Sequence, residues 1–206
     1  RAAPRRRVFY CTLLRGANQT GACHFNPTGD GSIIRSYVFA REGNHMLIVH
    51  PLEPVFDTSS RVLILGTMPS PKSREAGFYY AHPQNRFWKV LAALFKSEIP
   101  FGREIRREFV LRRHIALWDV LRSCEIEGAS DASIKRPVPN DLSVVLDRAP
   151  IQAIFCTGTK SAAFYRKLIE PVTKHSAITL PSTSPANCAV SFERLCAAYG
   201  AILPWL

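Results

Sequence analysis

The sequence lacks the motifs by which several large classes of enzyme are recognised. It contains no Gly-x-Gly-x-x-Gly dinucleotide fingerprint, no GxxxxGK[ST] phosphate loop and no GxSxG nucleophile elbow. No group of His and Glu residues has the spacing of a metal site, and no apolar run is long enough to cross a membrane. Dinucleotide-dependent redox enzymes, P-loop enzymes, serine hydrolases of the elbow type and membrane-spanning proteins are therefore disfavoured. We expect no cofactor, no metal ion and no membrane contact.

Acidic residues are also scarce. The chain has 16 Asp and Glu against 27 Lys and Arg, for a net charge of +11. Residues 1–45 account for +5 of this charge, because their seven arginines face only Asp30 and Glu42, and residues 46–206 carry the other +6. The body of the protein is thus basic in its own right, which indicates a polyanionic partner without identifying it.

The cysteine pattern does not indicate a disulfide framework or a metal site. There is no CxxC pair, no metal-ligand spacing and no recognisable signal peptide. We therefore expect reduced thiols in an intracellular protein, located in a bacterial cytoplasm near the nucleoid, with the nucleus as the alternative. The six cysteines are Cys11, Cys23, Cys124, Cys156, Cys188 and Cys196.

The first 45 residues differ in character from the rest. They open with the basic run RAAPRRR, and the Gly, Asn, Thr and Pro residues that follow interrupt any regular period. We predict that residues 1–45 form a poorly ordered basic extension and that residues 46–206 form one domain. This length suits a single sizeable core, and we expect a monomer.

Four short apolar runs alternate with segments of helical period in this domain. The alternation predicts an α/β fold, a three-layer sandwich with a four-stranded, mainly parallel sheet flanked by helices. Residues 123–141 are predicted to be a polar connection. Loops that follow parallel strands lie at one edge, so the loops GTMPSPKS and PSTSPAN should face one another across a cleft. The predicted strands are Val62–Leu65, Ile115–Trp118, Ile151–Cys156 and Ala177–Leu180; helices are predicted in 87–95, 103–113, 157–168 and 191–202.

The loops of this edge have an unusual composition. Twenty-one residues, 66–86, separate the first predicted strand from the next helical period, which is long for an α/β connection and favours a functional role. The loops offer small residues, prolines, aromatic rings, hydroxyls and amides. Such groups suit a planar, neutral ligand stacked on an aromatic ring, with hydroxyls and backbone N–H groups left for phosphates. A nucleobase on a nucleic-acid strand fits these groups and the basic charge.

Two motifs make the chain similar to a known family. GTMPS at 66–70 is followed by YYAHPQNRFWKVL at 79–91, and LPSTSPAN lies at 180–187. From about Val49 to the C-terminus the sequence resembles the uracil-DNA glycosylase superfamily. The block AHPQNRFWKV looks like that of the mismatch-specific uracil/thymine-DNA glycosylases, and together with PSTSPAN it is closest to the hypoxanthine-DNA glycosylase branch, family six.

The resemblance implies an activity and a partner. It implies a monofunctional glycosylase that flips a deaminated base out of damaged DNA, hypoxanthine first and uracil second. It also implies hydrolysis of the N-glycosidic bond to leave an abasic site in base excision repair. Two alternatives remain open: a weak or inactive module that only binds lesion DNA, and a hydrolase of free nucleosides.

The catalytic residue that the resemblance implies is Asn85. Mismatch-specific enzymes place a water-positioning Asn two residues after the first Gly of the opening loop, where this chain has Met68. A thioether is a weak acceptor and cannot orient water. The hypoxanthine branch supplies the Asn of HPxNxFW instead, which is Asn85. Because it directly precedes a helical period, Asn85 has capping of that helix as its alternative role.

The resemblance implies a base pocket around Tyr80. This ring would stack on the flipped base, with a half-buried core aromatic as the alternative. Gly66 would let the backbone approach the base, beside Met68. Pro69 would fix the loop, and His82 is expected to hold the second loop by a hydrogen bond rather than to donate a proton.

The second motif implies contacts with the DNA strand. Ser182 and Ser184 are the expected phosphate contacts. The loop inserts only Ser184, Pro185 and Ala186 where mismatch-specific enzymes have a larger wedge, so we expect reliance on badly paired lesions, which cost least to extrude. Lys160 is a candidate backbone contact, with a solvated lysine as the alternative.

Overall fold

The structure, a computed structural model, describes residues 38–42, 45–126 and 133–206. The predicted extension therefore lies outside the described residues, except for a strand at 38–42 that pairs with the strand at 45–49. The elements are β1 (Val38–Glu42), β2 (His45–Val49), β3 (Val62–Gly66), α1 (Pro71–Ala76), α2 (Phe87–Leu94), α3 (Arg103–Leu111), β4 (Ile115–Asp119), β5 (Leu121–Ile126), β6 (Lys135–Pro139), α4 (Ser143–Leu146), β7 (Ala153–Thr157), α5 (Thr159–Leu168), α6 (Glu170–Thr173), β8 (Ala177–Leu180), α7 (Phe192–Tyr199) and the 3₁₀ helix η2 (Gly200–Trp205).

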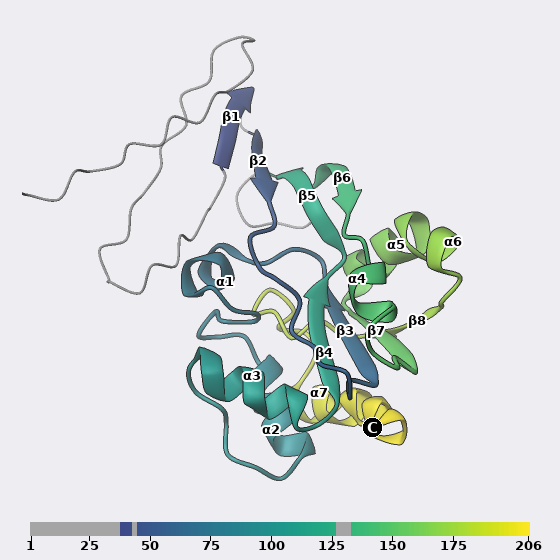
Figure 1. Ribbon diagram of the computed structural model, residues 1–206. Helices are drawn as coiled ribbons and strands as arrows, with labels where there is room; N and C mark the ends of the chain where they lie inside the picture. The colour runs from purple at the N-terminus through teal and green to yellow at the C-terminus, as the bar shows by residue number, and fades with distance from the viewer. Residues whose placement is uncertain (1–37, 43–44, 127–132) are drawn as a thin grey trace, which may run out of the picture.

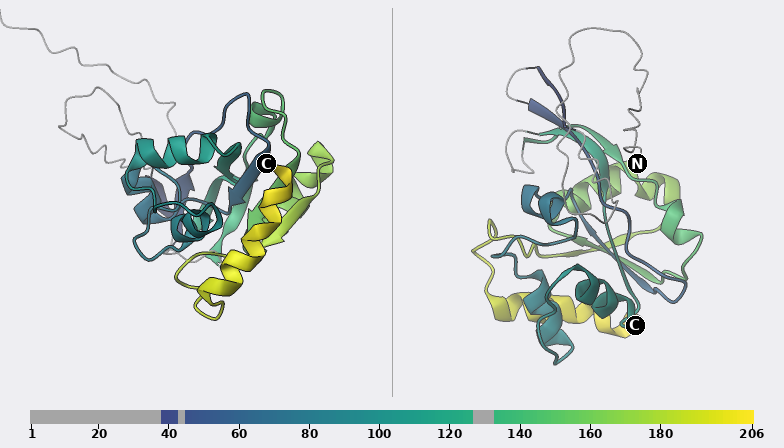
Figure 2. Two further views of the ribbon diagram at one scale, coloured as in Figure 1. Left: turned by 90° about the horizontal axis from the view of Figure 1, so that it is seen from below. Right: turned by 60° about the vertical axis from the view of Figure 1, so that its left-hand side comes forward.

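The central sheet is the predicted one. Its order is β4-β3-β7-β8 and every pairing is parallel, so the predicted α/β sandwich is confirmed. All residues of β3, β4 and β7 are buried, as expected for strands covered on both faces. Helices α4, α5 and α6 lie on one side of the sheet and α2, α3 and α7 on the other (Figures 1 and 2).

A second sheet was not predicted. It is antiparallel with the order β1-β2-β5-β6, so the prediction of a polar connection over residues 123–141 is wrong. The two prolines of β6 favoured a connection rather than a strand in the sequence. Proline is excluded only from central strands, however. Pro137 and Pro139 lie on an edge strand, where a missing N–H costs little.

The two sheets are joined by one continuous run of chain. Only Val120 separates β4 from β5, and the Val120 N–H donates to the Gly66 carbonyl at 2.9 Å. The antiparallel sheet therefore begins where the parallel sheet ends, as the long bent ribbon of β4 and β5 in Figure 1 shows. The pairing of β2 with β5 brings His50 to this junction, where the backbone N–H of His50 donates to the Arg122 carbonyl at 2.6 Å.

The long connection after β3 contains a short helix, α1, that was not predicted. Ser70 caps it by accepting the Ser73 N–H at 3.2 Å, and Pro71 occupies its first turn. Gly77 ends it in the left-handed conformation, with φ of 64°. Ser, Pro and Gly at these places are the ordinary start and stop signals of a helix, so the sequence did carry the information.

Gly66 lies opposite Asp119 at the ends of β3 and β4. A Cβ atom on Gly66 would lie 2.2 Å from Asp119 Oδ1, far inside contact distance. The carboxylate is buried and its other oxygen is hydrogen bonded, so it cannot swing away cheaply. The close approach of Asp119 to the β3 backbone thus requires glycine at position 66.

We predict that Gly66→Ala lowers the free energy of unfolding by about 1–3 kcal/mol, the usual cost of overpacking. Urea unfolding of the full chain measures this. Gly200→Ala is the matched control, because a Cβ there meets nothing within 4 Å and the backbone is already helical, with φ of −54°. Equal unfolding midpoints for the two variants would contradict the assigned role of Gly66.

Candidate functional site

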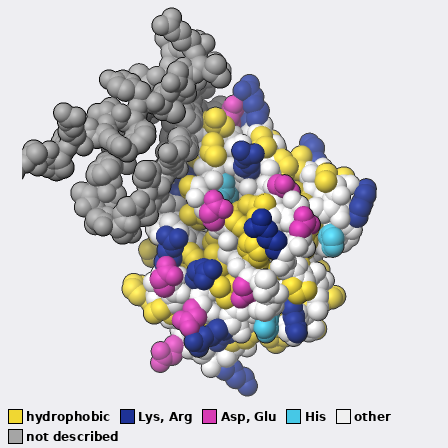
Figure 3. Space-filling model, in the orientation of Figure 1, with side chains coloured by type: hydrophobic (Ala, Val, Ile, Leu, Met, Phe, Trp, Pro, Cys, Tyr) yellow, Lys and Arg dark blue, Asp and Glu magenta, His cyan; other side chains and the backbone are white. Residues whose placement is uncertain are grey.

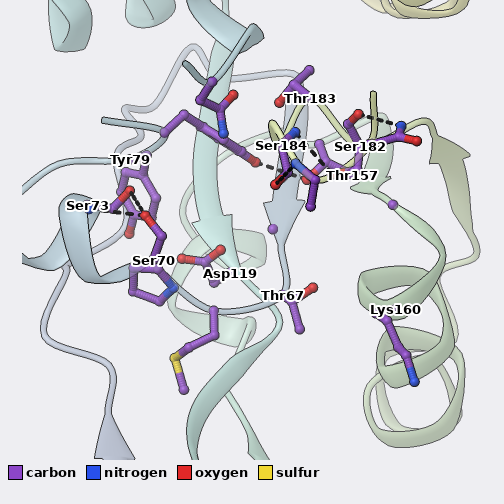
Figure 4. Close-up of a pocket in the computed structure, with 18 of the residues that line it drawn as sticks. Thr67, Ser70, Ser73, Tyr79, Asp119, Thr157, Lys160, Ser182, Thr183 and Ser184 are labelled. Atoms are coloured by element: carbon purple, nitrogen blue, oxygen red, sulfur yellow. Dashed lines mark hydrogen bonds between the residues drawn. The ribbon is translucent and has the colours of Figure 1, made fainter. Parts of the chain in front are cut away.

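A cavity of about 680 Å³ opens at the carboxyl edge of the parallel sheet. The loops after β3 and β8 both line it, so the two sequence motifs do meet across one cleft (Figure 4). The lining includes most of the predicted site residues together with several polar groups that were not predicted. Among its members are Gly66, Thr67, Met68, Pro69, Ser70, Tyr79, Tyr80, Asn85, Asp119, Thr157, Lys160, Ser182, Thr183, Ser184, Ala186 and Asn187.

Asn85 lines the cavity and also serves the helix that follows it. Its Oδ1 accepts the Phe87 N–H at 3.0 Å, at the first residue of α2. The N-cap residue itself is Arg86, so Asn85 supports the start of α2 from one position before the cap while it lines the cavity. The bond to Phe87 fixes the orientation of the carboxamide relative to the cavity.

Tyr80 lines the same cavity from a backbone held at φ of 52°. One face of its ring is stacked on Phe87, with centroids 3.8 Å apart and an interplanar angle of 15°. Its hydroxyl is hydrogen bonded to Thr157 Oγ1 at 3.2 Å. Burial, with a further contribution from the charge of Asp119, raises the pKa of the Tyr80 phenol well above its usual range. The ring is thus a fixed, neutral platform.

His82 and Pro185 are not among the residues that line the cavity. The His82 ring accepts the Gln84 N–H at Nδ1, at 3.2 Å, which is a loop-stabilising contact. Pro185 and its neighbour Ala186 are exposed at the tip of the loop after β8. The roles expected for both residues stay predictions.

The loop after β8 is held in shape by its own serines. Ser182 Oγ accepts the Ser184 N–H at 3.2 Å, and Ser184 Oγ accepts the Ala186 N–H at 3.3 Å. Asn187 Nδ2 closes the loop by donating to the Ser182 carbonyl at 2.8 Å. These bonds use the serine oxygens as acceptors, so both hydroxyl protons remain able to donate to a phosphate.

Arg86 was not predicted as a site residue, yet it joins the two motifs. Its guanidinium donates through Nη2 to the Asn187 carbonyl at 2.7 Å and through Nη1 to the Val190 carbonyl. Its backbone N–H donates to the Thr183 carbonyl at 3.1 Å. The residue after Asn85 therefore fixes the position of the second loop, which lies about a hundred residues further along the chain.

Asp119 and His50 form a buried pair that the sequence analysis also missed. His50 Nε2 lies 2.8 Å from Asp119 Oδ2, and the two side chains are 2% and 6% exposed. The Leu52 N–H donates to His50 Nδ1 at 3.1 Å. The proton of a neutral ring therefore resides on Nε2, where it is donated to the carboxylate. A charged residue at the end of an apolar run was the available signal for Asp119.

Charge and metal-binding groups complete the description. Lys and Arg side chains are scattered among acidic and hydrophobic ones over the face seen in Figure 3, so the basic charge is distributed there. In the ranges that the structure describes, no three His, Cys, Asp or Glu residues are arranged to hold a metal ion. None of the described helices is long and apolar enough to span a bilayer.

We predict that Arg86→Lys loosens the loop at 182–190, because one ammonium group cannot reach both carbonyls as the planar guanidinium does. Hydrogen bonds to charged groups are worth about 1.5–3 kcal/mol, so amide exchange in 182–190 should accelerate at least roughly tenfold. Arg107→Lys, on the exposed face of α3, is the matched control. Unchanged exchange in the Arg86 variant would mean that the loop does not depend on this clamp.

Comparison with known proteins places the chain in a family. The family model described as "UDG: Uracil DNA glycosylase superfamily" matches residues 53–206. A protein of Methanosarcina barkeri named hypoxanthine DNA glycosylase is 32% identical over 135 residues, which are 65% of this chain and 85% of that protein. A protein of the same name from Methanosarcina acetivorans is 30% identical over 141 residues, or 68% of this chain and 89% of that protein.

A solved structure supports the same assignment. It is a solution NMR structure from Methanosarcina acetivorans, described as a candidate uracil DNA glycosylase. The match has a TM-score of 0.64 and 26% identity, and it covers 77% of this chain and 99% of that one. The family match over residues 53–206 agrees with the α/β sandwich and with the meeting of the two motif loops. This chain belongs to the uracil-DNA glycosylase superfamily.

Proposed function

We propose that this protein removes hypoxanthine from damaged DNA, with uracil as a second base, and leaves an abasic site. The observation that carries the proposal is that Asn85, Tyr80 and the loop after β8 all line one cavity. Met68 lines it too, at the position where mismatch-specific enzymes have their water-positioning Asn. The names of the two Methanosarcina relatives support hypoxanthine as the first base. The cavity is large enough for a purine, since ligand pockets commonly measure about 300–1,000 Å³.

The reaction is a hydrolysis in which positive charge grows on the sugar and negative charge on the leaving base. DNA phosphates beside the sugar stabilise the first, and N–H and O–H donors around the base stabilise the second. Asn85 holds the attacking water. Its Oδ1 keeps the Phe87 N–H on one lone pair, so a second lone pair and the amide N–H₂ remain for water.

The flipped nucleotide is held on both sides. Tyr80, backed by Phe87, offers a ring for the base, and base–aromatic stacking is worth about 1–3 kcal/mol. Ser182 and Ser184 donate their hydroxyls to the flanking phosphates, and Lys160, which lines the same cavity, is a further candidate contact with the DNA backbone. The exposed tip at Pro185 and Ala186 enters the gap in the stack. A tip this small favours lesions that are already poorly paired.

We predict that Asn85→Ala slows release of hypoxanthine at least roughly tenfold, the lower range for a positioned catalytic group. The measurement is single-turnover cleavage of duplexes carrying one hypoxanthine, uracil or thymine, with abasic sites revealed by alkali. Gln84→Ala is the matched control, because it removes an exposed carboxamide one residue away. Release of none of the three bases by the wild-type protein would rule out the proposed activity.

Asn85 also accepts the N–H of Phe87 at the start of α2, so stability must be measured with the rate. Loss of this hydrogen bond costs about 1 kcal/mol, which leaves the protein folded at assay temperature. Asn85→Asp keeps an oxygen for the Phe87 N–H and should restore the unfolding free energy. If Asn85→Ala lowers stability and leaves the rate unchanged, the residue only supports the start of α2.

A further inference from the structure

We propose that Asp119 is the residue that reads the flipped base, and that His50 sets the polarity with which it does so. The Asp119 carboxylate accepts the N1–H of hypoxanthine through Oδ1, while His50 occupies Oδ2. This inference deepens the proposed function and depends on it, because it needs a base in the cavity.

The first step is the position of the carboxylate. Asp119 ends β4, is only 4% exposed, and lines the cavity. In the view of Figure 4 its carboxylate lies among the other lining side chains, between those of Ser70 and Thr157. Oδ1 lies directly against Gly66, in the space that any larger residue would fill. Among the described residues, only His50 donates to this carboxylate, and it does so at Oδ2.

The second step is the fixed direction of the His50 bond. The Leu52 N–H donates to Nδ1 at 3.1 Å, so Nδ1 must be the acceptor nitrogen of a neutral ring. Nε2 is then the donor, and it faces Oδ2 at 2.8 Å. A buried carboxylate needs hydrogen-bond donors, and its remaining oxygen is an acceptor that a ligand N–H can satisfy.

The third step is the chemistry of the base edge. In hypoxanthine the N1–H lies between a carbonyl and a C2–H, so a carboxylate can accept the N1–H with its second oxygen beside the C2–H. In uracil, thymine and xanthine the corresponding N–H lies between two carbonyls, and the second oxygen meets one of them. Adenine presents an acceptor at N1, which repels Oδ1. Guanine presents the same N1–H with an amino group beside it, and Oδ2 has a second lone pair besides the one used by His50, so this contact does not separate hypoxanthine from guanine.

A carboxylate at this place thus favours hypoxanthine over adenine, uracil, thymine and xanthine. Unpaired or opposed polar groups in a closed site are the strongest source of discrimination between similar ligands. Tyr80 gives a stacking surface that accepts any base, whereas Asp119 gives an edge contact that depends on the identity of the base.

The first test is Asp119→Asn, which keeps size and reverses polarity. His50 Nε2–H must be met by the amide oxygen, so the amide N–H₂ turns to the cavity and opposes N1–H. Release of hypoxanthine should fall at least roughly tenfold, and the hypoxanthine-to-uracil ratio of rates should fall too, because the variant removes the repulsion between the carboxylate and the uracil carbonyls. Asp147→Asn, on the exposed end of α4, is the matched control.

The second test assigns the polarity to His50. In the double variant His50→Ala/Asp119→Asn the amide can rotate and present its oxygen to the cavity. Part of the hypoxanthine release lost in Asp119→Asn should return, which a purely structural role of His50 would not produce. No recovery in a folded double variant would overturn the role of His50.

The third test needs no variant and separates this inference from the proposed function. Duplexes carrying 1-methylhypoxanthine lack the N1–H, so wild-type protein should release that base at least roughly tenfold more slowly than hypoxanthine. Equal rates, or an Asp119→Asn variant with unchanged rate and ratio, would overturn the role of Asp119 and leave the glycosylase activity standing. If no base is released, tighter binding to the hypoxanthine duplex supports base reading without catalysis, and equal binding overturns both.

Discussion

The site depends on the parallel pairing of β3 with β4, which ends with Gly66 opposite Asp119. From Gly66 the chain enters the first motif loop, and from Asp119 it passes through Val120 into the antiparallel sheet. This register therefore fixes the start of the first motif loop, the position of the Asp119 carboxylate in the cavity lining, and the place where His50 contacts that carboxylate. A slip of one residue would turn Asp119 to the other face of the sheet.

Most of the parallel sheet could be predicted because β3, β4 and β7 are largely apolar runs that are buried throughout, as is typical of strands covered on both faces. The antiparallel sheet could not be predicted in the same way. In β5 only some residues are buried, β6 contains two prolines, and the residues of β2 lie more than seventy positions before their partners in β5. Such pairing is decided by tertiary contacts rather than by local pattern.

Prediction of the site was limited by the same distance in sequence. Resemblance to a family brought Asn85, Tyr80 and the serines of the second loop to one place, and all of them line the cavity. His50 and Arg86 were missed because their partners, Asp119 and the carbonyls of Asn187 and Val190, are remote along the chain. The residues that adjoin His50 and Arg86 in the sequence give no indication that these side chains form long-range hydrogen bonds. Only Asp119, a charge at the end of a buried strand, carried a physical warning that a partner must exist.

The polar groups of the cavity share one design. Asn85 Oδ1 is bonded to the Phe87 N–H, Asp119 Oδ2 to His50, and the Tyr80 hydroxyl to Thr157, so each side chain is fixed by one atom. Fixing these groups before a ligand arrives removes the cost of reorganising them during the reaction, which is how preorganised sites gain most of their power. The antiparallel sheet, which could not be predicted from the sequence, is thus as necessary to this site as the two sequence motifs. It positions the His50 donor that keeps the Asp119 carboxylate in place.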